Sequence, residues 1–350
     1  MKKIVLCGGG SAGHVVPNIA LLPYLKRHYD EIHYIGTNGI EKDIIKNYPE
    51  ITFHEIKACK LKRSLSLSNL KIPFVLLTSI RQCRKILKQI NPNIIFSKGG
   101  YASLPVVFAH GKIPVVAHES DYSLGLANKL ILSKCKKMCF SFEATARKYN
   151  GKGIYTGSPI RKEILQGNKN KLNLNFDEKP TILIMGGSLG ATAINNTLDQ
   201  ARDELLKKYN IIHISGKNYT QKANIKGYHC VSYTNNIEDY LDASDIVISR
   251  SGSNAIYEFL QLKKPMLLIP LPRTSSRGDQ ILNANSFKEK GYAEILEQED
   301  LRKDTLISNI DKIYENRNKY ISAMKSNCTE IGNEKIVSVI LENEISRKSK

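Results

Sequence analysis

The hydrophobic positions in the first half of the chain follow two alternating periodicities. Short apolar runs rich in Ile and Val are typical of strands buried on both faces, and the longer stretches between them repeat apolar residues at helical spacing. The expected strands cover residues 3–6, 32–35, 52–56, 93–96, 114–117 and 137–140. Strands that are separated by helices predict a parallel sheet with crossover connections.

The second half of the chain repeats this pattern after a polar stretch, QGNKNKLNLNFDEKP, at residues 166–180. Strands are expected at residues 181–185, 211–215, 230–232, 246–249 and 266–269, and helices close the chain. The polar stretch indicates a connection between domains. The sequence therefore predicts an α/β fold with two doubly wound, Rossmann-like domains facing a cleft.

Three glycine turns each follow an expected strand and open a helical pattern. They are IVLCGGGSAGHVVP at residues 4–17, KGGY at 98–101 and GGSLG at 186–190. Such turns direct backbone N–H groups at an anion. The first turn has the G-x-G-x-x-G spacing, but no acid ends the strand at 32–35 to hold a dinucleotide ribose, and no P-loop Lys-Ser or Lys-Thr follows. A tight strand-to-helix connection is the alternative for each turn.

Several polar side chains stand near these turns. His14 follows the first turn and Glu119 ends a strand, so either suits proton transfer, although both also suit helix capping. Arg161 suits a diphosphate and Glu258 a ribose diol, with solvated surface positions as the alternative. Asp279 and Gln280 open a helix and offer groups for sugar hydroxyls.

Charge adds a second signal. The net charge is +19, and no Asp or Glu lies between Ile56 and His118, where an even spread of the 33 acids over 350 residues would place about six. Eleven Lys and Arg occupy the same window. This distribution favours a surface for phosphate or an anionic membrane over a general lysine bias. Seven cysteines without a C-x-x-C pair favour a reducing compartment, and neither a signal peptide nor a spanning helix is expected.

Residues 72–90 predict a helix with two apolar sides. Its core stripe comprises Ile72, Leu76, Cys83, Ile86, Leu87 and Ile90. The other side holds Phe74, Leu77 and Ile80 next to the basic residues Arg81, Arg84, Lys85 and Lys88. The run is too short to span a bilayer, so an apolar patch with a basic rim predicts contact with an anionic interface. Burial on two sides is the alternative.

No D-x-D occurs, so the usual carboxylate clamp for a metal-bound sugar nucleotide is missing. Neither H-E-x-x-H nor a plausible G-x-S-x-G elbow is present, so the sequence does not support a metallohydrolase or a serine hydrolase. The chain instead resembles one family, the MurG-type UDP-N-acetylglucosamine transferases of bacterial peptidoglycan synthesis. The resemblance covers nearly the whole chain. It is carried in order by GGGSAGHVVP, SKGGYASLP, HESDYSLGLANK, TGSPIR, GGSLGA, SRSGSNAIYE and the DQ-x-x-NA stretch at 279–284.

The resemblance implies a GT-B glycosyltransferase that moves N-acetylglucosamine from UDP to the 4-hydroxyl of the N-acetylmuramoyl unit of lipid I, giving lipid II with inversion. No metal or other cofactor is expected. The implied donor residues are Arg161, Gly187, Ser188, Gly190, Ser251, Glu258, Asp279 and Gln280. The implied acceptor residues are Gly9, Gly10, Ser11, Gly13, Gly99, Gly100, Tyr101, Asp121 and Asn128, with His14 ahead of Glu119 as the base.

Domain roles and partners also follow from the resemblance. Residues 1–159 would bind lipid I and face the membrane, joined by a last helix at 333–350, and residues 160–332 would bind UDP-N-acetylglucosamine. The protein would lie on the cytoplasmic face of the cell membrane, with anionic phospholipid and cell-wall synthesis or division proteins as partners and no nucleic acid. Two departures from the family are Asp121, where many relatives carry Asn, and Leu189, often polar in relatives.

Three alternatives remain at this stage. They are a transferase that adds hexose to diacylglycerol, a UDP-N-acetylglucosamine 2-epimerase, and a basic protein that binds membrane or nucleic acid without catalysis.

Overall fold

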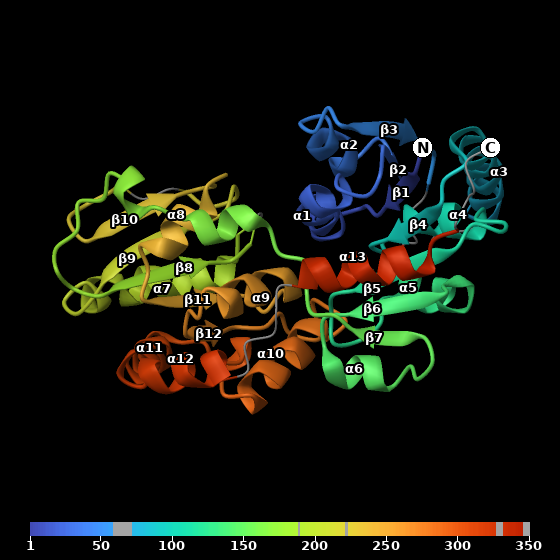
Figure 1. Cartoon of the computed structure of the whole chain (residues 1–350). Helices are drawn as coiled ribbons and strands as arrows, with labels where there is room; N and C mark the ends of the chain where they lie inside the picture. The colour runs from blue at the N-terminus through green and yellow to red at the C-terminus, as the bar shows by residue number, and fades with distance from the viewer. Residues whose placement is uncertain (59–71, 188–189, 221–222, 327–331, 346–350) are drawn as a thin grey trace. The chain divides into compact units, whose positions relative to one another are not determined.

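A computed structural model describes residues 1–58, 72–187, 190–220, 223–326 and 332–345. The chain divides into two compact units (Figure 1). The first contains Met1–Arg161 and Thr329–Lys350, and the second contains Lys162–Cys328. No helix among the described residues is long and apolar enough to cross a membrane.

The first unit is built on a parallel sheet of seven strands within the described residues, in the order β3-β2-β1-β4-β5-β6-β7. The strands are β1 Lys3–Cys7, β2 Glu31–Gly36, β3 Ile51–Glu55, β4 Ile94–Ser97, β5 Val115–Glu119, β6 Lys137–Phe140 and β7 Gly153–Tyr155. Its helices are α1 Val16–Leu25, α2 Ile40–Ile45, α3 Ile72–Ile90, α4 Ser103–Phe108, α5 Leu126–Ile131, α6 Glu143–Arg147 and α13 Gly332–Asn343, with short 3-10 turns η1 Ala12–His14 and η3 Leu132–Lys134.

Both faces of this sheet are buried, which explains why its strands are continuous apolar runs. Ile4 and Leu6 of β1 join a core formed with α1 and α13, whereas Val5 and Cys7 join a core formed with α3 and α4. The last helix, α13, lies along this sheet (Figure 1). Asn333, buried at its start, accepts a hydrogen bond from Ile160 N at 2.8 Å and donates to the carbonyl oxygen of Ile160 at 2.8 Å.

The second unit has a parallel sheet of six strands within the described residues, in the order β10-β9-β8-β11-β12-β13. The strands are β8 Thr181–Met185, β9 Asn210–Ile214, β10 Tyr228–Val231, β11 Ile246–Ser249, β12 Met266–Leu268 and β13 Ala293–Ile295. The helical segments are η4 Lys162–Gln166, η5 Lys169–Lys171, α7 Thr192–Leu205, α8 Ile237–Asp242, α9 Ser253–Gln261, α10 Asp279–Glu289, η6 Gln298–Asp300, α11 Lys303–Glu315 and α12 Arg317–Ser326.

The predicted fold class is confirmed, since each unit carries a doubly wound, Rossmann-like parallel sheet. Most predicted strands agree with the observed ones to within one or two residues, which is the ordinary uncertainty of strand ends. The edge strands β7 and β13 were not among the predicted strands. Each has three residues, too few to show a strand periodicity.

Candidate active site

The first two glycine turns meet at one point of the first sheet. Strand β1 pairs with β2 on one side and β4 on the other, so the strand order changes direction between β1 and β4. Gly8–Gly10 follow β1, and Lys98–Gly100 follow β4. Open α/β sheets bind ligands at this switch point, beyond the carboxyl ends of the strands.

The two turns touch each other and leave no room for side chains. A Cβ on Gly100 would lie 2.1 Å from the carbonyl oxygen of Gly9, and one on Gly10 would lie 2.5 Å from Cε1 of Tyr101. Both glycines have positive φ, +80° at Gly100 and +88° at Gly10. Glycine is the residue that combines this conformation with this contact.

A buried carboxylate that no sequence motif indicates supports the first turn from inside. Glu41, at the start of α2, is fully buried. Its Oε2 accepts a hydrogen bond from Gly10 N at 3.3 Å, and its Oε1 accepts one from Thr37 N at 2.9 Å. The expectation that the N–H groups of this turn face a ligand is therefore wrong for Gly10. Glu41 stands five residues after Gly36, the last residue of β2, so an acid sought only at the end of the strand does not include it.

His14 lies in η1, between the first turn and α1, and its side chain is partly exposed. Its Nδ1 is 2.9 Å from Oγ of Ser11. When Nδ1–H donates to this hydroxyl, Nε2 is the unprotonated nitrogen that can accept a proton. Ser11 thus has the geometry of a group that selects the tautomer of His14.

Glu119 occupies the end of β5 as expected, but its carboxylate is engaged within the protein. Oε1 accepts from Asp121 N at 3.1 Å, and Oε2 accepts from Gly125 N and from Nδ2 of Asn128, both at 2.9 Å. These three N–H donors hold the carboxylate in place and fix the loop after β5. Asn128 is buried, so its side chain supports Glu119.

Two buried basic groups stand beside Glu119. His118 is fully buried, and its Nε2 lies 3.1 Å from the carbonyl oxygen of Gly157, to which Nε2–H donates. Burial and the nearby Lys98 hold the pKa of His118 well below its usual range, so this histidine is neutral. Lys98 is also buried, at the end of β4, and no motif in the sequence had singled out its side chain.

The third glycine turn lies at the switch point of the second sheet, where β8 pairs with both β9 and β11. A Cβ on Gly190 would lie 2.3 Å from the carbonyl oxygen of Ser215, whereas nothing lies within 4 Å of one on Gly187. Gly190 therefore packs against Ser215, directly after β9, whereas the space around an added Cβ on Gly187 is open. The α7 helix begins directly after the turn. Ser188 and Leu189 lie outside the described residues.

A network of hydrogen bonds joins the ends of β11 and β12 to α10. Ser251 is fully buried and its Oγ donates to the carbonyl oxygen of Gln280 at 2.8 Å, while Oε1 of Gln280 accepts from Leu271 N at 3.0 Å. Asn283 Nδ2 donates to the carbonyl oxygen of Ser251 at 3.1 Å. Arg250, another residue that the sequence analysis missed, donates to the carbonyl oxygen of Ile269 at 3.0 Å. Ser251 and Gln280 thus have structural contacts in addition to any role at a ligand.

The remaining expected donor residues are polar and partly buried. Glu258 lies in the middle of α9, and Asp279 is the first residue of α10. The carboxylate of Asp279 forms an ion pair with Arg277 at 2.6 Å. Arg161 is the last residue of the first unit before the chain enters the second.

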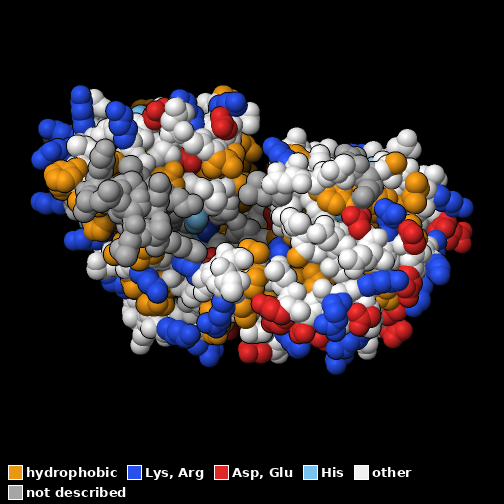
Figure 2. Space-filling model, turned by 180° about the vertical axis from the view of Figure 1, so that it is seen from behind, with side chains coloured by type: hydrophobic (Ala, Val, Ile, Leu, Met, Phe, Trp, Pro, Cys, Tyr) orange, Lys and Arg blue, Asp and Glu red, His pale blue; other side chains and the backbone are white. Residues whose placement is uncertain are grey.

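Helix α3 presents apolar side chains to solvent. Phe74 is 73% exposed and Leu77 is 54% exposed. Ile80, expected beside them, is half-buried and packs against the core instead, because it stands one turn closer to the buried Cys83. Arg81, Arg84, Lys85 and Lys88 are exposed along the same helix. Figure 2 shows hydrophobic side chains beside Lys and Arg side chains at this end of the first unit.

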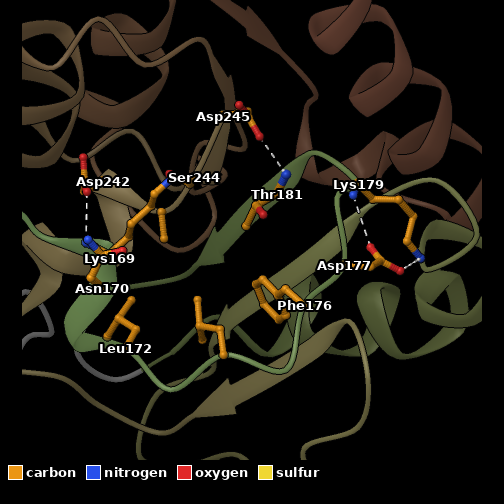
Figure 3. Close-up of a pocket in the computed structure, with 12 residues that line it drawn as sticks. Lys169, Asn170, Leu172, Phe176, Asp177, Lys179, Thr181, Asp242, Ser244 and Asp245 are labelled. Carbon is orange, nitrogen blue, oxygen red and sulfur yellow. Dashed lines mark hydrogen bonds and ion pairs between the residues drawn. The ribbon is translucent and has the colours of Figure 1, made fainter.

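A cavity of about 520 Å³ lies away from the glycine turns, at the amino ends of β8 and β11 (Figure 3). Two carboxylates in its lining accept hydrogen bonds from backbone N–H groups. Asp245 Oδ2 accepts from Thr181 N at 2.7 Å, and Asp242 Oδ2 accepts from Lys169 N at 2.9 Å. These contacts fasten the polar stretch at residues 166–180, which belongs to the second unit, onto the second sheet. The cavity thus lies where this stretch packs on the sheet and not at the candidate site.

The described residues contain no cluster of three or more His, Cys, Asp or Glu side chains that could hold a metal ion. Each of the two switch points instead offers glycine turns, hydroxyls and a small number of charged side chains. Such groups suit a ligand that carries phosphate and sugar hydroxyls.

Family models and curated relatives assign this chain to the same family. The models of the glycosyltransferase family 28 N-terminal and C-terminal domains match residues 4–140 and 181–340. A curated protein of Clostridium tetani is 47% identical over 349 residues, 97% of each chain, and one of Lachnospira eligens is 48% identical over 353 residues, 98% of this chain and 99% of the other. Both are UDP-N-acetylglucosamine–N-acetylmuramyl-(pentapeptide) pyrophosphoryl-undecaprenol N-acetylglucosamine transferases.

Solved structures share the fold. The crystal structure of Acinetobacter baumannii MurG has a TM-score of 0.77 at 22% identity and covers 98% of this chain and 100% of that one. A calicheamicin glycosyltransferase has a TM-score of 0.72 at 10% identity and covers 98% of each chain. The family models, the curated relatives and the fold agree, and the chain belongs to glycosyltransferase family 28, among the MurG-type N-acetylglucosamine transferases.

Proposed function

We propose that this protein transfers N-acetylglucosamine from UDP to the 4-hydroxyl of the N-acetylmuramoyl unit of lipid I, forming lipid II with inversion at the anomeric carbon. The observation that carries the proposal is the extent of the similarity, 47% identity over 97% of both chains. A glycine turn at the switch point of each sheet supports it, because both substrates carry a diphosphate.

The second unit is proposed to bind the donor. The turn around Gly187 and the start of α7 would take the diphosphate through backbone N–H groups, together with Ser188. Arg161, the last residue of the first unit, is the further residue proposed for the diphosphate. Glu258 would accept hydrogen bonds from the uridine ribose, and Asp279 and Gln280 would meet the N-acetylglucosamine hydroxyls. For Ser251 we propose a positioning role, because its hydroxyl already bonds Gln280. Stabilising the departing UDP in this way requires no metal.

The first unit is proposed to bind the acceptor, with the contacting turns around Gly10 and Gly100 at its diphosphate. The N–H of Gly10 donates to Glu41, so the proposed contacts come from other groups of the two turns. His14 is the proposed base, oriented by Ser11 at 2.9 Å. Glu119 is the less suitable base, because it holds three N–H donors of the loop that follows it. We therefore assign Glu119 and Asn128 the role of shaping the acceptor loop.

Membrane contact belongs to the same proposal. Lipid I carries a polyprenyl tail, so an enzyme that uses it must reach the membrane surface. Phe74 and Leu77 are exposed on α3 beside exposed cations. Apolar side chains with a basic rim bind anionic interfaces. We place the protein on the cytoplasmic face of the cell membrane, with anionic phospholipid and cell-wall synthesis or division proteins as its neighbours.

One assay tests the reaction. Purified protein with EDTA is expected to move labelled N-acetylglucosamine from UDP to a lipid I analogue in detergent. Transfer to diacylglycerol alone would indicate a glycolipid-forming enzyme. Formation of UDP-N-acetylmannosamine, or of free N-acetylmannosamine and UDP by reaction with water, in the absence of an acceptor would indicate an epimerase. The His14→Ala variant is the matched control, since it keeps the proposed donor residues and is expected to lose transfer.

A further inference from the structure

Lys98 is a buried cation that the proposed function has not used. It directly follows β4 and precedes Gly99, its side chain is 2% exposed, and its Nζ lies 2.6 Å from Oγ of Ser120. Ser120 is the hydrogen-bond partner that the described residues give to this ammonium group. An ammonium carries three N–H donors, and burying it costs free energy unless nearby negative charge compensates.

The compensating charges come from the acceptor loop. Glu119 and Asp121, on either side of Ser120, both favour the charged form of Lys98. Burial opposes them and lowers the pKa of Lys98 to about 8, so the ammonium is still the major form at neutral pH. His118 adds no charge, because its pKa is held well below its usual range. On the β1 side the neighbour is Gly8, which has no charged group.

The three charged side chains, Lys98, Glu119 and Asp121, therefore carry a net charge of −1 together. Without the lysine the same group would carry −2, next to the turns proposed for an acceptor diphosphate. Like charges brought together in a partly desolvated site oppose binding strongly. Glu119 cannot move away, because Asp121 N, Gly125 N and Asn128 Nδ2 hold its oxygens.

We propose that Lys98 is a positioning and specificity-determining residue for the acceptor, which holds the loop at Ser120 and offsets the charge of Asp121 so that the loop admits a diphosphate-bearing substrate. The proposal rests on the proposed function. Lys98 acts through Ser120, Glu119 and Asp121 and does not itself touch the reacting atoms.

Three variants test whether Lys98 offsets the charge of Asp121. They are Lys98→Met, Asp121→Asn and the double variant. Lys98→Met is expected to raise the KM for a lipid I analogue roughly tenfold and to leave the KM for UDP-N-acetylglucosamine unchanged. Asp121→Asn in the same chain is expected to restore the acceptor KM to within about threefold of the native value, because it returns the net charge of the group to −1. Lys112→Met removes an exposed cation of the same unit and is the control for net charge.

The pH profile separates this role from a purely structural one. The native kcat/KM for the acceptor is expected to fall as pH rises through about 8, where Lys98 loses its proton. Lys98→Met should lack this alkaline limb. A structural lysine would lower thermal stability without splitting the two KM values or moving the pH profile.

Several results would overturn the proposal. They are an unchanged acceptor KM in Lys98→Met, a loss that Asp121→Asn fails to relieve, or an alkaline limb that persists without Lys98. If Lys98→Met does not fold, Ser120→Ala removes the hydrogen bond alone and is expected to raise the acceptor KM in the same direction; an unchanged KM there contradicts the proposal. A native protein that binds UDP but transfers no sugar would instead count against the proposed function.

Discussion

The carboxylate of Glu41 accepts a hydrogen bond from the backbone of the first glycine turn, with 3.3 Å between Gly10 N and Glu41 Oε2. Glu41→Gln keeps the shape but places an amide donor where an acceptor is needed. We expect the free energy of unfolding to fall by about 1–3 kcal/mol, as for other buried groups that lose a hydrogen-bond partner. Urea unfolding monitored by circular dichroism measures this change.

The control is Asp43→Asn on the same helix, α2. The side chain of Asp43 is 78% exposed and forms a long ion pair with Lys46. Exposed ion pairs contribute little to stability. The free energy of unfolding of this variant should therefore stay within about 0.5 kcal/mol of that of the native protein. An equal fall in the free energy of unfolding of Glu41→Gln and Asp43→Asn would mean that the buried carboxylate does not support the turn.

Glu258 and His14 are proposed to serve different substrates, and their variants should separate binding from catalysis. Glu258→Ala is expected to weaken UDP binding at least tenfold, because it removes the proposed acceptor for the ribose hydroxyls. His14→Ala should leave UDP affinity unchanged and lower kcat by about 10²–10⁴, the usual contribution of a general base. Calorimetric titration with UDP and steady-state kinetics measure the two effects. Equal losses of UDP affinity would contradict the division of roles.

Gly190 is expected to tolerate no side chain. Its φ is +82°, and a Cβ would lie 2.3 Å from the carbonyl oxygen of Ser215. Gly190→Ala therefore combines backbone strain with a clash against Ser215, directly after β9. We expect the free energy of unfolding to fall by more than about 3 kcal/mol and UDP binding to weaken.

Gly111→Ala provides the comparison for strain alone, since φ is +61° there and nothing lies within 4 Å of an added Cβ. We expect a loss of about 1 kcal/mol, the cost of the left-handed conformation. Thermal unfolding of both variants would reveal the difference, and similar losses would show that the contact with Ser215 is relieved by a small shift.

Phe74 and Leu77 are predicted to enter the membrane interface. The double variant Phe74→Ser and Leu77→Ser should bind vesicles rich in phosphatidylglycerol several-fold more weakly, because it removes apolar area beside the cations of α3. Co-sedimentation with vesicles at low and high salt measures binding. High salt should weaken the residual binding of the double variant, which depends on the cations of α3. Leu165→Ser, at a residue 47% exposed in the second unit, is the matched control and should bind as the native protein does. An unaffected double variant would contradict the assignment.

The sequence by itself determined the alternation of strands and helices. The apolar runs are buried on both faces of the sheets, so the pattern of each strand reports its environment directly, as at residues 181–185, where the predicted and observed strands coincide. The glycine turns were equally visible, because a left-handed backbone such as that of Gly10 leaves little choice of residue.

Tertiary structure decided what the polar groups near these turns do. Glu119 was visible as a carboxylate, but only the fold brings Gly125 N and Asn128 to its oxygens. Glu41 reaches Gly10 across 31 positions of sequence, and Lys98 reaches Ser120 across 22. Burial and hydrogen-bond partners depend on which strands lie next to each other, and no local pattern in the chain encodes that neighbourhood.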